Sequence, residues 1–506
     1  MKCEVGDLAE LVRGVSYDKA EVKSEGSKGY VPILRATNID QSLDFDELVF
    51  VPNRFVSDEQ MLRSGDIIIA ASSGSKSVVG KAAQFSGTWK GSFGAFCKGI
   101  RPFAPSNPRY LGYFFQSPDY RRTVSRLASG SNINNLKREH ISQLSIDLPP
   151  QGEQGRIVEK LDEYLSDLDA GTAALERARA NLKRYRAAVL KAAVEGRLTE
   201  KWRAAHPDVE PAEKLLERIL AERRKKWEEA QLKKFAEKKQ APPKGWKDKY
   251  SGPVKPDVAE LPKLPEGWCW ATFSQLGELD RGKSKHRPRN AAHLYGGPYP
   301  FVQTGDVKAA GTFLHDYEQT YSAAGLKQSK LWPTGTLCIT IAANIGESTI
   351  LGIDACFPDS VVGFVPSSPI STRFIQLQLQ AARRRIEAMA PATAQKNINL
   401  EVLYRVPIAL APESEQKRVV DEFDSIGSLE EQAGLACTTG LARAMKLRQS
   451  TLKRAFEGKL VPQDPKDEPA GELLARIRAE REAGKGLIGQ GKARHKILKK
   501  IRTKTA

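Results

Sequence analysis

The sequence predicts an α+β protein in which two tandem α/β domains alternate with two long helices, and these helices are expected to pair as an antiparallel coiled coil. Three observations predict this fold. An internal repeat covers most of the chain, each repeat contains short β-branched runs, and apolar residues recur at heptad spacing after each mixed domain. At 506 residues, the chain also exceeds the roughly 250–300 residues at which a single hydrophobic core stops growing.

The repeat is visible as matched segments that occur in the same order twice. SGDIIIAASSG from Ser64 matches TGTLCITIAAN from Thr334, and LPPQGEQGRIVEKLDEY from Leu148 matches LAPESEQKRVVDEFDSI from Leu410. RYRAAVLKAAVEGRLT (184–199) matches KLRQSTLKRAFEGKLV (446–461), and PAEKLLERILAERRKKW (211–227) matches PAGELLARIRAEREAGK (469–485). Each copy therefore has a mixed domain, a long helix and a shorter charged helix.

Each copy opens with a mixed domain of short strands and helices. The runs DIIIA (66–70) and LCITI (337–341) are rich in β-branched residues and are bounded by Gly with Ser or Thr, which is typical of strands. Gly and Pro punctuate the rest at short intervals, and helix-like segments follow at 108–128 and 370–389. About 150 residues per copy is an ordinary size for one core.

A long helix is predicted to follow the first mixed domain. After Pro149 and Pro150, apolar residues recur alternately four and three positions apart, which is the spacing of a coiled-coil seam. The predicted seam residues are Ile157, Leu161, Tyr164, Leu168, Leu175, Leu182, Tyr185 and Val189. A helix over 154–195 would be on the order of 60 Å long at about 1.5 Å per residue.

The second long helix has a looser seam, with Gly434, Cys437 and Gly440 in its middle. Its predicted seam residues are Val419, Phe423, Ile426, Leu441, Met445 and Leu452. An amphipathic helix packed on its own domain would also explain the pattern. We favour antiparallel pairing of the two helices, because neither has an equally long partner elsewhere in the chain and the copies should be related by a pseudo-twofold axis.

The other segments are charged. The helical pattern at 211–237 returns at 469–482, with Leu215 and Leu216 matching Leu473 and Leu474, and either a solvated face or a partner-docking helix explains it. A Pro/Lys-rich linker follows the first of these helices. The tail 483–506 is basic and contains no acid, so it is either solvated or contacts DNA or a partner.

We therefore divide the chain into six segments. These are the first mixed domain (1–150), the first coiled-coil helix (151–200), a charged helix with its linker (201–262), the second mixed domain (263–412), the second coiled-coil helix (413–462), and a charged helix with the basic tail (463–506).

Composition favours a polyanionic partner and an intracellular setting. The chain has 79 Lys and Arg against 61 Asp and Glu, a formal net charge of +18, and such an excess favours nucleic acid because neutralised phosphates release counterions. The six cysteines are scattered and form no CxxC pair, so neither a disulfide framework nor a zinc site is expected. The sequence MKCEVGDLAELVRG that opens the chain has no apolar core, and no run of 18 apolar residues occurs, so we expect a cytoplasmic protein.

Signatures of catalysis are missing. The segment from Gly74 to Lys81 has five residues between its glycines, where a phosphate-binding loop needs four, and Ala82 stands where a Ser or Thr would hold Mg²⁺. No GxGxxG, HExxH or GxSxG motif occurs in a fitting context. The adenine-methylating NPPY or DPPY motif is absent as well, and Asp147-Leu-Pro-Pro150 resembles it without the aromatic residue. We expect no catalytic residue and no metal site in this chain.

The alternation of two mixed domains with two helical repeats resembles the specificity (S) subunit of type I restriction-modification systems, the HsdS family. The junctions LPPQGEQGRIV and LAPESEQKRVV, the helix ends EGRLT and EGKLV, and the domain opening LPEGWCWATFSQLGEL (264–279) are similar to that family's hallmarks. The resemblance covers nearly the whole chain. The first copy departs from the pattern because it lacks the Gly-Trp lead of the second.

The resemblance implies a DNA-binding subunit without a cofactor of its own. Each mixed domain would be a target-recognition domain that reads one half of a bipartite double-stranded DNA site, and the paired helices would set the spacer. Two modification subunits, which bind S-adenosylmethionine and methylate adenine at N6, would dock on the helices. Restriction subunits that use ATP and Mg²⁺ can join and cleave.

Polar loops after apolar strands are the candidate readers, since Arg, Lys, Asn and Gln make bidentate contacts to base edges while phosphate contacts only set the register. A helix N-cap with a turn would explain the same Ser, Thr and Asn residues. The candidates are Ser72, Ser73, Ser75, Lys76, Gly130, Ser131, Asn132, Asn134 and Lys137 in the first domain, and Thr304, Asn344, Thr393, Gln395, Lys396 and Asn397 in the second.

Two other functions are considered. One is a non-catalytic coiled-coil scaffold that binds only protein and does no sequence-specific DNA reading. The other is a stand-alone nuclease or ATPase, which the missing motifs disfavour.

Overall fold

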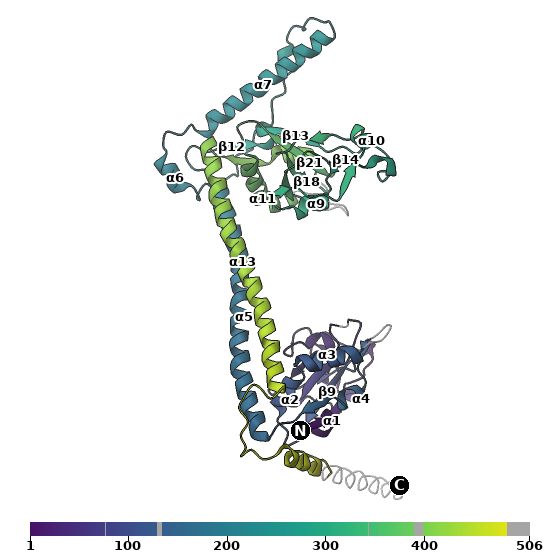
Figure 1. The fold of residues 1–506 in the computed structure, drawn as a ribbon. Coiled ribbons are helices and arrows are strands. Elements are labelled where there is room, and N and C mark those ends of the chain that lie inside the picture. The colour runs from purple at the N-terminus through teal and green to yellow at the C-terminus, as the bar shows by residue number, and fades with distance from the viewer. Residues whose placement is uncertain (76, 129–133, 343, 389–397, 483–506) are drawn as a thin grey trace. The chain divides into compact units, whose positions relative to one another are not determined.

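The computed structural model describes residues 1–75, 77–128, 134–342, 344–388 and 398–482 (Figure 1). The chain divides into two compact units. Unit 1 contains Met1–Arg177 and Cys437–Ala506, and unit 2 contains Ala178–Ala436. Each long helix is therefore divided between the two units.

A four-stranded antiparallel sheet forms the centre of the mixed domain in unit 1. Its order is β2 (Ala9–Arg13), β9 (Cys97–Pro102), β5 (Ile67–Ala70) and β7 (Ala82–Gln84). All four residues of β5 are buried because the sheet is covered on both faces: Ile67 and Ile69 join one apolar cluster and Ile68 another. A smaller sheet orders β4 (Val49–Pro52), β3 (Tyr30–Leu34) and β8 (Ser92–Phe93).

Short helices cover one face of the unit 1 sheet. They are α1 (Val5–Leu8), α2 (Pro108–Phe114), α3 (Pro118–Leu127) and α4 (Arg138–Ser142). Asn107 and Ser117 cap α2 and α3 by accepting bonds from backbone amides, and proline follows each cap, an arrangement that favours helix initiation. Strands β1 (Lys2–Glu4) and β11 (Ser145–Asp147) pair and lead into the long helix.

Unit 2 repeats this domain with larger sheets. Its main sheet orders β13 (Gly277–Arg281), β21 (Val361–Pro366), β18 (Leu337–Thr340), β19 (Ser348–Leu351) and β15 (Phe313–Leu314). A second sheet orders β16 (Gln319–Tyr321), β14 (Tyr295–Phe301), β20 (Ala355–Cys356) and β17 (Leu331–Trp332), and β12 (Cys269–Thr272) pairs with β22 (Pro407–Leu410). The helices are α8 (Phe273–Leu276), α9 (Thr304–Ala309), α10 (Ala323–Lys327), α11 (Thr372–Ala388) and α12 (Leu400–Arg405).

The two long helices are α5 (Gln151–Val194) and α13 (Glu413–Phe456), each of 44 residues. The repeated Glu-Gln pair of the junctions has a structural reason. The side chain of Gln154 donates to the carbonyl oxygen of Pro149, and that of Gln416 donates to the carbonyl oxygen of Ala411, both at 2.9 Å. Each glutamine thus satisfies a carbonyl at the step from strand to helix.

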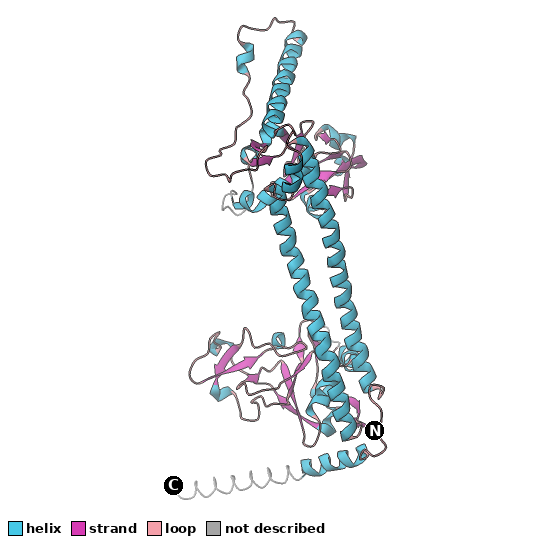
Figure 2. Ribbon diagram, turned by 90° about the vertical axis from the view of Figure 1, so that its left-hand side faces the viewer, coloured by secondary structure: helices cyan, strands magenta, loops and turns pink. Residues whose placement is uncertain are grey.

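The helix halves pair antiparallel within each unit, as the fold class predicted (Figure 2). In unit 1, Asp169 lies 2.6 Å from Arg448, and a side chain at Gly440 would meet Leu175, with its Cβ only 2.9 Å from a leucine methyl. In unit 2, Val189 and Ala193 share an apolar cluster with Phe423 and Val419. Gly440, which interrupts the predicted seam of the second long helix, therefore makes room for Leu175 of the first.

The residues predicted to form the heptad seam differ in burial. Ile157, Leu161, Val189, Val419, Phe423 and Leu452 are buried, and Leu168, Leu175, Leu182, Ile426 and Leu441 are half-buried. Tyr164, Tyr185 and Met445 are instead 40, 52 and 62% exposed, and Leu165 is buried. The start of α5 packs on its own domain as well as on α13, so its buried face follows the domain and departs from a strict 3.5-residue seam.

The charged helices also pack on the domains. Helix α7 (Ala212–Glu237) buries Leu215, and the helical residues 470–482 bury Leu473 and Leu474. Arg223 donates to the carbonyl oxygen of Ser274 at 2.7 Å, and Arg481 makes the equivalent bond to Gly6 at 3.1 Å. These leucines are thus core residues of their own units and do not form a docking face.

Part of the linker after α7 is tied back to unit 2. Trp246 stacks on Trp227 of α7 with ring centroids 5.9 Å apart, and Lys247 lies 3.0 Å from Glu228. The backbone amide of Val254 donates to the hydroxyl of Ser274 at 3.1 Å. The predicted Pro/Lys-rich linker therefore includes a strap held on both sides.

Candidate nucleic-acid interface

A hairpin loop between β5 and β7 brings several candidate residues of unit 1 together. Within it, β6 (Ser72–Ser73) pairs with β10 (Asn134–Asn135), so that Ser73 lies opposite Asn134. The backbone amide of Leu136 donates to the carbonyl oxygen of Ala71 at 2.8 Å. Two polar segments that are about sixty residues apart in the sequence thus form one small ladder at the end of β5.

The corresponding loop in unit 2 runs between β18 and β19 and contains Asn344. The backbone amide of Ile398 donates to the carbonyl oxygen of Ile341 at 2.9 Å, which is the counterpart of the Leu136 bond in unit 1. Thr340 fixes the turn, because its hydroxyl accepts from the backbone amide of Glu347 at 3.1 Å and donates to the carbonyl oxygen of Asn344. Thr304 is placed differently, at the first residue of α9.

The loop serines hold their own turn. The hydroxyl oxygens of Ser75 and Ser77 lie 2.8 Å apart, and the backbone amide of Ser75 donates to the hydroxyl of Ser73 at 3.2 Å. Lys137 is exposed and precedes α4. Lys76, Gly130, Ser131, Asn132, Thr393, Gln395, Lys396 and Asn397 lie outside the described residues. Whether any candidate contacts a base stays a prediction.

Each loop is supported by a glycine and by an arginine from the following helix, which sequence reasoning missed. Gly80 and Gly346 have φ of +78° and +77°, a region that disfavours other residues. Arg121 of α3 donates to the carbonyl oxygens of Ser77 and Val79 at 3.3 and 3.1 Å. Its counterpart Arg383 of α11 lies 2.8 Å from the carboxylate of Glu347. The internal repeat could have revealed these arginines, because Arg121 and Arg383 occupy equivalent positions in the two copies.

Unit 2 presents a basic segment at the same sheet edge as its loop. Strands β13 and β18 both pair antiparallel with β21, so they run in the same direction. Their last residues, Arg281 and Thr340, therefore lie at the same end of the sheet. The following sequence GKSKHRPR (282–289) carries Lys283, Lys285, Arg287 and Arg289, and none of the four is buried. Arg289 is paired with Asp359 at 2.9 Å. Positive charge beside a polar loop suits a phosphate backbone.

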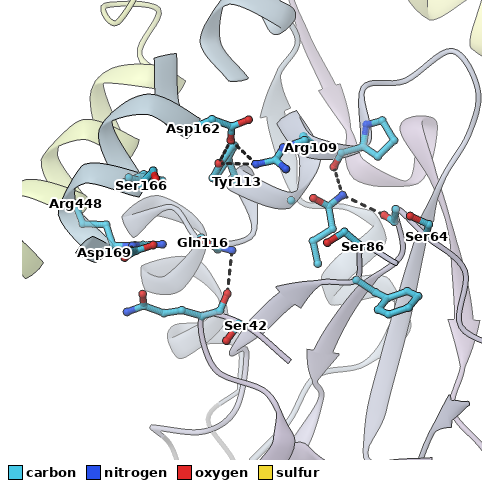
Figure 3. Close-up of a pocket in the computed structure, with 17 residues that line it drawn as sticks. Ser42, Ser64, Ser86, Arg109, Tyr113, Gln116, Asp162, Ser166, Asp169 and Arg448 are labelled. Atoms are coloured by element: carbon cyan, nitrogen blue, oxygen red, sulfur yellow. Dashed lines mark hydrogen bonds and ion pairs between the residues drawn. The ribbon is translucent and has the colours of Figure 1, made fainter. Parts of the chain in front are cut away.

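A cleft of about 850 Å³ lies in unit 1 between the mixed domain and its helix halves (Figure 3). Its charged groups neutralise one another: Arg109 and Tyr113 both donate to Asp162, and Arg448 pairs with Asp169. Burial, together with the Asp162 hydrogen bond, raises the pKa of Tyr113. The charged side chains that line this cleft are therefore paired between the mixed domain and the helices, and within the helix pair.

Metal ligands and thiols offer little further chemistry in the described part of the chain. No group of three or more His, Cys, Asp or Glu side chains there could hold a metal ion. The six cysteines are free, and burial raises the pKa of Cys97 to about 12. Among the same residues, no helix is both long and apolar enough to cross a membrane.

The fold is a duplicated domain in which each copy presents a polar hairpin loop at the end of a buried central strand. The family model described as the type I restriction modification DNA specificity domain matches residues 1–181 and 265–433. This is more than half of the chain, and the chain belongs to this family.

Similar proteins agree with this assignment. The chain is 28% identical over 502 residues to the type I restriction enzyme EcoKI specificity subunit of Escherichia coli strain K12, with 95% of each chain covered. It is also 28% identical over 504 residues to the StySPI specificity subunit of Salmonella potsdam, again with 95% of each covered. A solved structure of a type I R-M system shares the fold, with a TM-score of 0.56, 18% identity and coverage of 91% of this chain and 98% of that one.

Proposed function

We propose that this specificity subunit binds a bipartite double-stranded DNA site and that each mixed domain reads one half of it. The observation that carries the proposal is the pair of equivalent hairpin loops, each joined to the strand end by the same backbone bond, from Leu136 in unit 1 and from Ile398 in unit 2. Equivalent scaffolds with different loop residues suit two half-sites of different sequence, since base contacts specify and scaffold contacts position.

The long helices would determine the unread spacer between the half-sites. A helix of 44 residues extends about 66 Å at about 1.5 Å per residue. Equivalent faces of duplex DNA recur about every 34–36 Å, and paired helices of this length would set the number of base pairs between the half-sites. Lengthening α5 and α13 together by one heptad should change the preferred spacer and leave the half-sites as they were.

Catalysis would belong to partner subunits. Two modification subunits would supply S-adenosylmethionine and methylate adenine at N6, and restriction subunits would supply ATP- and Mg²⁺-dependent cleavage. Docking is supported by the likeness to the specificity subunits of type I restriction enzymes over nearly the whole chain.

A selection experiment tests DNA reading. The chain, assembled with its modification subunits, is incubated with a library of random duplexes at moderate salt, and the retained duplexes are sequenced. We expect enrichment of a two-part motif with a fixed spacer. Retention without any enriched sequence would contradict the proposal and favour a scaffold that binds only protein.

A substitution experiment tests the assignment of one half-site to one domain. Changing Asn132, Asn134 and Lys137 together to alanine should degrade one half of the enriched motif and leave the other intact. Equal loss of both halves would contradict the assignment. Turnover of DNA or ATP by the purified chain alone would contradict the assignment of catalysis to partners.

A further inference from the structure

Three cationic residues lie near one another at the end of the unit 1 sheet that carries the hairpin loop. Arg13 is the last residue of β2, and it lies directly opposite Lys98 of β9. Side chains of directly opposed residues project from the same face of a sheet. Arg138 begins α4 and contributes, together with Arg13, to the electrostatic environment of Lys98. Arg13 and Arg138 are exposed and Lys98 is half-buried.

This cluster is electrostatically unfavourable in the protein alone. Like charges directly opposite each other destabilise a strand pair. Burial lowers the pKa of Lys98, the neighbouring carboxylate of Glu139 raises it, and Arg13 and Arg138 lower it again, so one acid stands beside three cations. Arg101, three residues further along the same strand, is different. It donates to the carboxylate of Asp66 at 2.7 and 2.9 Å and to the carbonyl oxygens of Glu59 and Met61. Arg101 is therefore a structural arginine, whereas the three-residue cluster carries excess positive charge.

The cluster lies beside the hairpin loop. Cys97, the neighbour of Lys98, is opposite Ala70, the last residue of β5. The carbonyl oxygen of Phe96 accepts from the backbone amides of Ala71 and Ser72 at 2.8 and 3.0 Å. The strand that carries Lys98 thus begins against the strand β6 that pairs with Asn134 and Asn135.

We propose that Arg13, Lys98 and Arg138 form a phosphate-binding site for the DNA backbone at the half-site read by unit 1. This inference rests on the proposed function. The site is particular to unit 1, because the equivalent positions in unit 2 are Arg281, Val362 and Leu400. Unit 2 carries its cations on the segment 282–289 instead. A backbone contact adds affinity and register without sequence preference.

The salt dependence of binding tests the site. Lys98→Met keeps the packing of the aliphatic stem, and Arg138→Gln changes an exposed residue with little risk to folding. Each variant, assembled with its modification subunits, is titrated with cognate and random duplex over a range of NaCl concentrations. The slope of log K against log[NaCl] should fall by about 0.9 for each phosphate that the protein no longer neutralises. Affinity for both duplexes should fall by the same factor, with the half-site preference unchanged.

Lys90→Met is the matched control. Lys90 is not buried and adjoins Gly91, whose carbonyl oxygen accepts from Leu62 ahead of β5, and so lies at the opposite end of the strand. An unchanged slope for both cluster variants, or a change equal to that of the control, would overturn the proposal. So would a weakening confined to the cognate duplex, which would make these residues base readers.

A second arm separates DNA from a free anion as the ligand. Inorganic phosphate is added to the wild-type and Lys98→Met complexes, and thermal unfolding is recorded. Phosphate stabilisation of the wild type without any change in DNA affinity on substitution would assign the cluster to a small anion and overturn the DNA contact. If the wild-type complex fails to distinguish cognate from random duplex, the proposed function is contradicted. The salt dependence of binding would still show whether the cluster contacts phosphate.

Discussion

The hairpin loops of the two units share their support and differ in what they present. The segment 71–81 joins β5 to β7 in unit 1 and includes the extra strand β6, whereas β18 and β19 in unit 2 are joined by the shorter segment 341–347. Both loops nevertheless end in a glycine with positive φ and meet an arginine from the following helix. The duplicated scaffold therefore holds a loop in place while leaving its length and sequence free to vary.

The strongest effect is expected at the junction of unit 2. The buried carboxylate of Glu415 accepts from Thr199 at 2.6 Å, from Trp268 at 2.9 Å and from Arg203 at 2.9 Å. Glu415→Ala should lower the stability of unit 2 by about 3 kcal/mol, because a partly buried arginine loses its counter-ion. Hydrogen exchange monitored separately in the two units measures this. A loss spread equally over both units would contradict a local role.

The next effect separates the two loop glycines. An added Cβ at Gly80 would lie 2.9 Å from a methyl of Val124, whereas at Gly346 it would lie 3.1 Å from the flexible side chain of Arg383. Both substitutions place alanine at positive φ, which costs about 1–2 kcal/mol. Gly80→Ala should therefore destabilise its unit more than Gly346→Ala does. Denaturant unfolding followed by hydrogen exchange compares them, and a reversed order would contradict the packing argument.

A smaller effect is expected at the arginines that support the loops. Arg121→Ala removes two hydrogen bonds to carbonyl oxygens, and Arg383→Ala removes two partly exposed ion pairs, one to Glu347 and one to Glu387. Each should cost about 1 kcal/mol and should weaken only the half-site of its own unit. Selection from random duplexes reads this out, with Arg54→Ala as a control on an exposed ion pair. Weakened recognition of the half-site that is read by the other unit would contradict this assignment of one half-site to each unit.

The smallest change in stability is expected at Glu153, which occupies in unit 1 the position that Glu415 occupies in unit 2. Burial raises the pKa of Glu153, and Asp467 adds to this against Arg156. A carboxyl group whose pKa is higher in the folded state than in the unfolded state favours folding at low pH. This contribution to stability is lost as the pH rises from the usual pKa of the carboxyl, near 4.5, through the raised pKa of the folded state. Glu153→Gln should therefore stabilise unit 1 slightly at about pH 7 and have no such benefit below about pH 4. Thermal unfolding at both pH values checks this.

The sequence predicted what depends on local pattern and repetition. The β-branched run at Ile67–Ile69, the two long helices and the equivalence of the copies are encoded by spacing along the chain. It could not predict what depends on register. Arg13 and Lys98 become neighbours only because β2 and β9 pair in one particular alignment. Tyr164 was assigned to the seam because heptad spacing cannot distinguish a face that meets a domain from one that meets a helix.

The proposal that each unit reads its own half of one DNA site can be tested by exchanging a single loop. The segment 71–81 is replaced by that of a relative with a different recognition sequence, and adenine methylation is mapped across a genome by sequencing. We expect a methylated motif in which one half is new, while the other half and the spacer length are unchanged. A motif that changes in both halves would contradict separate reading by the two units, and a motif that does not change would contradict base reading by this loop.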